Sequence, residues 1–212
     1  DLGTSLSIII LGVFILFLVG IRIWKFFLGI IATIISIPIF LQYIKPYQRD
    51  RIVSFLNPES DPLGQGYQLI QSKIALGSGG VTGKGFLQGT QSYLEYLPEK
   101  QTDFIFTLIG EEFGFLGTIF IILIFILLIA VCYFISIKCF HTFGRILALG
   151  VASNLFIYVF MNIAMVSGLM PVVGIPLPLI SYGGSVMLSI MISMGLVLNV
   201  EINYNLKKLN NA

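Results

Sequence analysis

Five long apolar runs constrain this chain more than any other feature, because a membrane-spanning helix needs about 20 apolar residues to cross roughly 30 Å of hydrocarbon. The residues are 57% hydrophobic and only 10% charged, which is far from the balance of a soluble domain. The runs are Leu6–Ile21, Phe26–Leu41, Phe104–Ile137, Ile146–Leu169 and Val186–Val200. The sequence therefore predicts an all-α polytopic membrane protein with five transmembrane helices.

These runs differ in length. The first two are short and need their flanking residues to complete a crossing. The third, with 34 residues, would rise about 51 Å at 1.5 Å per residue, so we expect its first turns to lie outside the hydrocarbon. The last is also short, and Leu177–Ile180 could lengthen it.

Basic residues predict the orientation, because Lys and Arg in short connections stay on the cytoplasmic side. They follow the first, third and fifth runs as Arg22 and Lys25, Lys138 and Arg145, and Lys207 and Lys208. We therefore expect residues 42–103 and 170–185 to form extracytoplasmic loops. The same rule places Asp1 outside and the C-terminus in the cytoplasm.

The loop over residues 42–103 is longer than most loops, and loops of this length are uncommon unless they are functional or disordered. Apolar spacing predicts a short helix over Tyr67–Leu76, which could lie on the membrane surface. Several glycines then predict a flexible run around Lys84. This run does not match a phosphate-binding P-loop, because Ser78 and Gly85 stand where that pattern needs Gly and Ser or Thr.

The segment 170–185 is apolar, yet its prolines and glycines forbid a continuous helix. Irregular backbone at membrane depth is tolerated only where protein or a wet cavity satisfies its polar groups. The segment therefore predicts a stretch that dips into the helix bundle beside a cavity. The alternative is an ordinary turn packed on the helix ends.

Acidic residues in or beside apolar runs are candidate site residues, because burying a charge near a membrane is costly. Four qualify: Asp1, Asp103, Glu111 and Glu112. At about 100° per residue, Glu111 falls nearer than Glu112 to the helix face of Asp103. Asp103 and Glu111 could together hold a metal or orient a basic partner. Alternatively, either glutamate is half of a structural ion pair.

Other polar residues indicate no site. Asn154, Tyr158 and Asn162 form a stripe that interhelical hydrogen bonding explains. Cys132 and Cys139, the only cysteines, are expected to be free thiols. His141 has no Cys, Asp or second His at ligand spacing, which argues against a zinc site or a catalytic triad. The net charge of +2 identifies no partner, and we expect no nucleic acid.

Along its whole length the chain resembles the shape, elongation, division and sporulation family. The segments that carry the resemblance are Asp1–Ser5, Asn57–Gly64, Gly66–Tyr67, Gln71–Ala75, Gly89–Ser92, Leu97–Glu99, Thr102–Phe106, Gly110–Glu112 and Pro176–Ser185. Within the family, Gly89–Ser92 and Met170–Pro176 look like the elongation branch rather than the division branch. Gln101 stands where the family often has His, which excludes a titrating role at that position.

The resemblance implies a ten-helix membrane enzyme that polymerises lipid II into glycan strands on the outer face of the bacterial cytoplasmic membrane. The chain would be the C-terminal half of that enzyme, forming a single membrane domain over residues 1–212. By motif, the family's essential acidic residue falls on Asp1. The orientation predicted from the basic residues independently places Asp1 outside, where the substrate sugars are.

Chain growth requires the 4-hydroxyl of one sugar to attack the anomeric carbon of another while a lipid diphosphate leaves. A carboxylate in a partly desolvated site has a raised pKa and suits the general base, the role we predict for Asp1. A single inverting displacement needs no second, nucleophilic carboxylate. The diphosphate needs Lys, Arg or a divalent cation such as Mg²⁺, and the candidates on this chain are Lys73, Lys84, Arg49 and Lys100.

The remaining predicted substrate-binding residues are Asp103, Glu111, Ser181, Tyr182 and Gly183. The partners implied by the resemblance are lipid II, the nascent glycan strand, a class B penicillin-binding protein with transpeptidase activity, and other membrane proteins of the elongation complex. Two other functions stay open at this point. A lipid II flippase or transporter also combines broken helices with buried carboxylates, and a membrane scaffold for a cell-wall transpeptidase would need no catalytic residues.

Overall fold

The computed structural model describes residues 2–43, 46–61, 64–93, 97 and 99–210, and each predicted span is a helix in it. These helices are α1 (Leu2–Leu18), α2 (Ile23–Tyr43), α6 (Ile105–Lys138), α7 (Thr142–Val166) and α8 (Gly184–Asn210). Among the described residues, α6, α7 and α8 are long and apolar enough to cross a membrane, while α1 and α2 are apolar over shorter stretches. The prediction of a helical, multi-pass membrane protein is confirmed.

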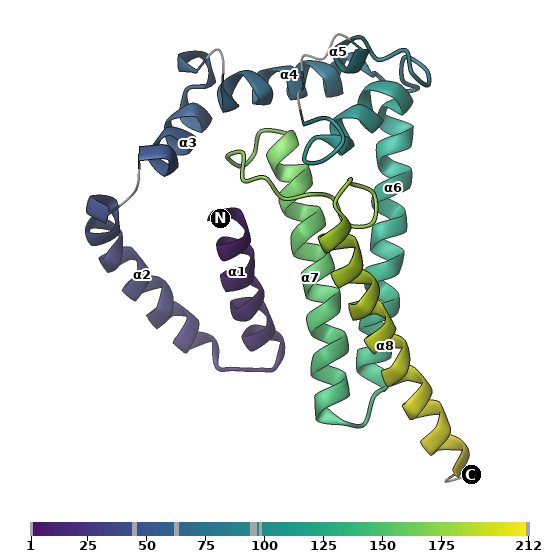
Figure 1. Cartoon of the computed structure of the whole chain (residues 1–212). Coiled ribbons are helices and arrows are strands. Elements are labelled where there is room, and N and C mark those ends of the chain that lie inside the picture. Colours follow the sequence, from purple (N-terminus) through teal and green to yellow (C-terminus); the bar gives the residue numbers. More distant parts are fainter. Residues whose placement is uncertain (1, 44–45, 62–63, 94–96, 98, 211–212) are drawn as a thin grey trace.

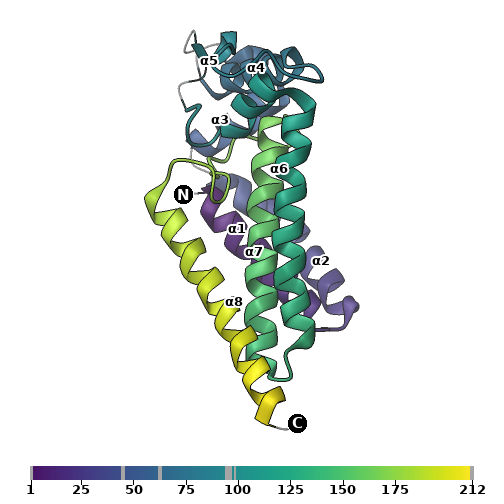
Figure 2. The same ribbon diagram turned by 90° about the vertical axis from the view of Figure 1, so that its right-hand side faces the viewer.

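Helices α6 and α7 form the centre of the bundle. They run antiparallel and side by side, with α1 along α7 and α8 crossing on another face (Figures 1 and 2). Phe14 of α1 stacks on Phe156 of α7 with 6.0 Å between the ring centroids. Ala148 and Ala152 of α7 are buried in one cluster with apolar residues of α6 and α8, and such small side chains let membrane helices approach closely.

The outward faces of the long helices remain apolar. On α2, for example, Phe27 and Ile35 are more than 60% exposed, and Leu127 of α6 is equally open. A soluble monomer rarely exposes apolar patches of such size. These faces therefore require lipid or another apolar protein surface around them.

The long loop folds into a cap over one end of the bundle. It contains α3 (Pro46–Leu56), a 3₁₀ turn η1 (Pro58–Ser60), α4 (Gln65–Ser78) and α5 (Thr90–Tyr93). The helix predicted over Tyr67–Leu76 is α4, which lies across the ends of α6 and α7 (Figure 1). Its Ser72 hydroxyl is fully buried, 2.7 Å from the Thr107 hydroxyl of α6, and donates to the Val166 carbonyl of α7. Helix α4 therefore packs against the helix bundle.

The proline- and glycine-rich segment lies against the bundle beneath this cap. Val173, Ile175 and Leu177 are at most 2% exposed, so the segment contributes to the core as its apolar sequence predicts. Asn162 of α7 donates to the carbonyls of Ile175 and Asp103, at 2.7 and 2.8 Å. It thus satisfies irregular backbone that would otherwise be buried without partners.

Two expectations about these residues were wrong. Asn162 bonds to non-helical backbone rather than to a neighbouring helix, because the irregular segment brings free carbonyls within its reach. Residues 177–180 do not extend the last span, since α8 begins only at Gly184. A hydrogen-bonded turn from Leu177 to Ser181 separates them from the helix.

Candidate functional site: two acidic centres at the capped end

Helix α6 is broken at Gly114, whose backbone (φ 66°, ψ −161°) is open to glycine alone. The loop from Gly79 to Gly85 fills the break. Four backbone hydrogen bonds of 2.9–3.1 Å join the two segments: Lys84 N–H to Glu111 O, Gly85 N–H to Glu112 O, Phe115 N–H to Gly80 O, and Leu116 N–H to Val81 O. The loop thereby replaces the helical bonds that the break removes.

Close packing makes this insertion dependent on glycine. Gly79 lies directly against the Gly110 carbonyl, and Gly83 against the backbone of Glu112 and Gly114, so neither position has room for a Cβ. The glycine run was expected to be flexible. It is instead held in place by α6, because backbone N–H and C=O groups on both sides of the break form hydrogen bonds with the loop.

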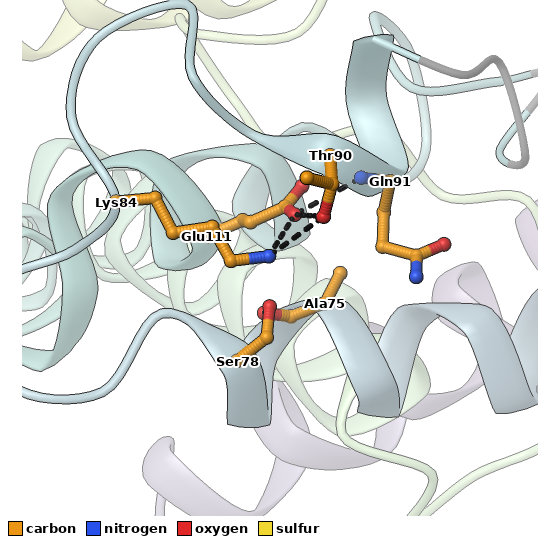
Figure 3. A network of polar contacts seen from close by, with 6 residues as sticks. All are labelled: Ala75, Ser78, Lys84, Thr90, Gln91 and Glu111. Carbon is orange, nitrogen blue, oxygen red and sulfur yellow. Dashed lines mark hydrogen bonds and ion pairs between the residues drawn. The ribbon is translucent and has the colours of Figure 1, made fainter.

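The first acidic centre is Glu111, whose side chain is only 1% exposed. Its carboxylate accepts from Lys84 Nζ at 2.7 Å, from the Thr90 hydroxyl at 3.2 Å and from the Gln91 backbone N–H at 3.0 Å. Figure 3 shows these groups converging on one carboxylate above α4. Gly89 packs against the same side chain, so the space around the carboxylate is closed.

This arrangement favours the structural interpretation of Glu111. Lys84 also donates to Thr90 at 2.8 Å, so its charge is already compensated. A cation held this way is poorly suited to receive a diphosphate. The neighbouring Glu112 is buried as well, and its carbonyl accepts from Gly85.

The second acidic centre is Asp103, which lies just before α6 and interacts with Glu99 and Arg51. The pKa of Asp103 is raised from the ordinary value of 3.8 to about 6, and burial is the largest cause. A hydrogen bond with Glu99 and the negative charge of that residue contribute to the increase, whereas the Arg51 guanidinium opposes it. The predicted pairing of Asp103 with Glu111 is therefore wrong. Asp103 precedes the helix, so helical spacing does not apply to it.

Two polar cavities adjoin this second centre, and both are lined by Glu99 and Asp103. One, of about 370 Å³, is also lined by Arg51, Gly64, Gln65, Gln68 and residues 172–174. The other, of about 610 Å³, is also lined by Lys100, Gln101, Thr102 and Tyr182. The carboxyl pair therefore stands where the two cavities meet. Cavities of this size accommodate small ligands.

The segment before α8 is tied to the wall of the larger cavity. The Ser181 hydroxyl donates to the Thr102 carbonyl at 2.6 Å and accepts from the Leu177 N–H at 2.7 Å. The Tyr182 N–H donates to the Gln101 carbonyl at 2.9 Å. Ser181 thus acts as a backbone clamp, while the Tyr182 ring, 79% exposed, projects into the open. Gly183 immediately precedes α8.

The other predicted residues are dispersed. Lys73 is exposed on α4 and lies over Gly168, and Arg49 is exposed on α3, whereas Lys100 lines the larger cavity. Asp1 lies outside the described residues. Gly3, two positions later in the chain, packs against the Val173 carbonyl, and Val173 lines the smaller cavity. The start of α1 therefore lies next to a wall of this site.

Sequence reasoning missed Arg51, Gln65, Gln68 and the role of Glu99. Glu99 could have been found, because it belongs to the Leu97–Glu99 segment that carries the family resemblance. The other three come from α3 and α4 and meet Asp103 only through the tertiary fold. Among the described residues, no group of three His, Cys, Asp or Glu side chains is arranged to hold a metal.

The fold and the site define a helical, multi-pass membrane protein with a polar, two-cavity site at its capped end. The family model described as "Cell cycle protein", which covers FtsW, RodA and SpoVE, matches residues 1–206. The chain belongs to this family, and the resemblance drawn from its motifs is confirmed.

Similar proteins include the peptidoglycan glycosyltransferase MrdB of Escherichia coli K12, which is 49% identical over 204 residues, or 95% of this chain and 55% of that protein. The stage V sporulation protein E of Bacillus subtilis 168 is 42% identical over 202 residues, 95% of this chain and 54% of that protein. The chain thus spans about half the length of these curated relatives.

The fold also matches a chain of a peptidoglycan synthase complex, solved in a study of how polymerization and crosslinking are coordinated. The TM-score is 0.77 with 33% sequence identity, over 96% of this chain and 56% of that one. The match extends over the cap as well as the bundle, because it covers nearly the whole of this chain.

Proposed function

We propose that this chain is part of a peptidoglycan glycosyltransferase that joins lipid II into glycan strands during cell elongation. The observation that carries the proposal is the pair of polar cavities at the capped end. Residues from four family motifs meet there: Gly64 at the end of Asn57–Gly64, the Leu97–Glu99 and Thr102–Phe106 segments, and Tyr182 of the segment before α8. The 49% identity to MrdB, against 42% to the sporulation protein, supports the elongation branch.

The charge distribution supports an orientation with the cap outside the bacterial cytoplasmic membrane. The basic connections after α1 and α6 lie at the end of the bundle opposite the cap (Figure 1). Because such connections stay in the cytoplasm, the loops 42–103 and 170–185 are extracytoplasmic in this proposal and α8 ends in the cytoplasm. The site then faces the side where the cell wall is built.

In the proposed reaction, Asp1 takes the proton from the 4-hydroxyl of the acceptor sugar as that oxygen attacks the donor's anomeric carbon. The new glycosidic bond forms as the bond to the lipid diphosphate breaks, with inversion at that carbon. Lys73, Arg49 and Lys100 are the candidate cations for the leaving diphosphate. Lys84 and Glu111 are assigned to holding the loop in α6, because their charges compensate each other.

A class B penicillin-binding protein is the proposed partner, together with other membrane proteins of the elongation complex. The similarity to a chain of a peptidoglycan synthase complex supports this assignment. The wide apolar faces of the long helices offer surfaces for such membrane contacts.

The test is lipid II polymerisation by the complete protein with its transpeptidase partner, comparing wild type with Asp1→Asn and Asp1→Ala. Loss of glycan strands while the complex stays intact supports a polymerase with Asp1 in its site. Near-normal strands from both variants would remove Asp1 from the reaction. Lipid II translocation without strand formation by wild type would favour a transporter, and neither activity would favour a scaffold.

A further inference from the structure

The two cavities at the capped end differ in lining but share one boundary, the side chains of Glu99 and Asp103. A ligand that occupied both would therefore pass over this carboxyl pair. Carboxylates accept hydrogen bonds from hydroxyl groups in several geometries. Adjoining cavities joined at such a pair fit a ligand made of two linked units, each rich in hydroxyls.

The charges around the cavities balance. Glu99 and Asp103 carry the negative charges, Arg51 lines the smaller cavity and Lys100 the larger one. A diphosphate would meet two carboxylates as well as two cations, and like charges at contact distance are destabilising. A metal ion would likewise meet both cations. The balance thus favours a neutral, polar ligand over either ion.

Two polar atoms of the smaller cavity's side chains lack hydrogen-bond partners among the described residues. Nη1 of Arg51 is a buried donor and Oε1 of Gln65 is a buried acceptor. Leaving a buried polar group without a hydrogen bond is unfavourable, so a ligand that offered both an acceptor and a donor would bind more favourably at these two atoms. An acetamido group, with its C=O and N–H, supplies that combination.

The walls also offer apolar surface. Val172 and Val173 line the smaller cavity, and the exposed Tyr182 ring lines the larger one. Sugar rings present apolar C–H faces between their hydroxyls, which suits contact with an aromatic ring that also has a polar end.

We infer that these two cavities are adjacent sugar subsites, in which the carboxyl pair of Glu99 and Asp103 receives sugar hydroxyls and the Arg51 and Gln65 cavity holds an acetamido sugar. The diphosphate then lies elsewhere on the capped end, which leaves Lys73 and Arg49 rather than Lys100 as its candidate cations. This inference rests on the proposed function and specifies which part of a lipid-linked saccharide this site recognises.

A binding experiment tests the ligand class. Saturation-transfer NMR with the complete protein in nanodiscs uses N,N′-diacetylchitobiose as probe, cellobiose as the matched disaccharide without acetamido groups, and inorganic pyrophosphate as competitor. The inference expects the acetamido disaccharide to bind more tightly than cellobiose and pyrophosphate not to displace it. Displacement by pyrophosphate, or equal binding of the two disaccharides, would overturn it.

Kinetics on variants separate this inference from the proposed function. Gln65→Met removes the cavity's unsatisfied acceptor, and Gln88→Met is the matched control on an exposed glutamine outside both cavities. We expect Gln65→Met to raise the KM for lipid II about threefold to tenfold, the effect of one lost hydrogen bond, with the control unchanged. If Gln65→Met does not fold, the same KM measurement on Gln68→Met, which changes another glutamine of the smaller cavity, replaces it.

The outcomes are distinct. Wild type that binds the acetamido disaccharide but makes no glycan strands would contradict the proposed function alone. Wild type that polymerises lipid II while the Gln65 and Gln68 variants keep the KM of the control would contradict the sugar subsites alone.

Discussion

Asp103 and Glu111 stand eight positions apart around the start of α6, yet their surroundings are opposite. Glu111 is 1% exposed and receives a lysine ammonium, a hydroxyl and a backbone N–H. Asp103 faces a second carboxylate, and cavities open on either side of it. A carboxylate whose bonds are all made stabilises a fold, whereas one that shares its site with a like charge and open space is suited to binding or proton transfer.

The difference arises from the backbone around each residue. The break at Gly114 draws the loop 79–85 into α6 and closes the space over Glu111. Asp103 lies before the helix, where Ser181 bonds the segment before α8 to Thr102 and both cavities still reach the Asp103 side chain. Five predictions would break or sharpen this contrast, beginning with the largest expected effect.

Gly114→Ala should destabilise the protein by about 3 kcal/mol, because the Gly114 backbone conformation excludes other residues and a Cβ would meet the backbone of Gly83. The matched control is Gly77→Ala, at an exposed position of α4 where an added Cβ would contact no other atom. That change should stabilise by up to about 1 kcal/mol. Thermal unfolding of the purified protein in detergent measures both, and equal Tm values for the two variants would refute the closed loop.

Lys84→Met should destabilise by about 2 kcal/mol, because it leaves the Glu111 carboxylate buried without its cation. The partial exposure of Lys84, at 26%, keeps the loss below that of a fully buried pair. Adding Glu111→Gln to Lys84→Met should recover part of the Tm. Strictly additive losses in this double-mutant cycle would mean that the two side chains are not coupled.

Asp103 should titrate with a pKa of about 6, against the ordinary value of 3.8. Because the folded protein binds this proton more tightly than the unfolded chain, the stabilising contribution of the protonated form is complete below 3.8 and is lost as the pH rises through about 6. The Tm of wild type relative to Asp103→Asn should therefore fall over that interval. A relative Tm that rose instead would contradict the assigned surroundings.

Glu99→Gln tests whether Glu99 contributes to the raised pKa of Asp103. It should lower the pKa of Asp103 by removing a like charge, while burial, the largest cause, keeps that pKa above its ordinary value. Difference infrared spectroscopy of the carboxyl band, with Asp103→Asn as reference, measures the shift. An unchanged pKa would show that the two carboxyl groups do not interact.

Ser181→Ala should have the smallest effect, about 1 kcal/mol, since it removes the hydroxyl that joins Thr102 and Leu177. Ser185→Ala, at an exposed position of α8, is the control. If the clamp keeps the larger cavity open, Ser181→Ala should also weaken binding of N,N′-diacetylchitobiose. A loss of Tm with full binding would limit Ser181 to stability.

The helices of this fold could be predicted from apolar runs, because hydrocarbon thickness fixes the length of a span. The cap could be predicted only in part, as α4. The loop around Lys84 could not, because glycines indicate permissive backbone and not the partner that fixes it; that partner is the break in α6 around Gly114.

The site residues, too, could be predicted from the sequence only in part. Asp103, Lys100 and Tyr182 could be chosen from the sequence and do meet at one cavity. Arg51 and Gln65 could not, because a polar residue on a cap helix looks solvated until the fold brings it beside Asp103. Pairing Asp103 with Glu111 failed because helical spacing was applied to a residue that precedes the helix.

The most direct test of the Asp103 site is lipid II polymerisation by the complete protein, comparing Asp103→Asn with wild type. Size-exclusion chromatography confirms that both complexes are intact. Strand synthesis by wild type and at least a tenfold loss in Asp103→Asn would support a functional site at the two cavities. Equal strand synthesis by both proteins would contradict it and leave Asp103, like Glu111, as a structural residue.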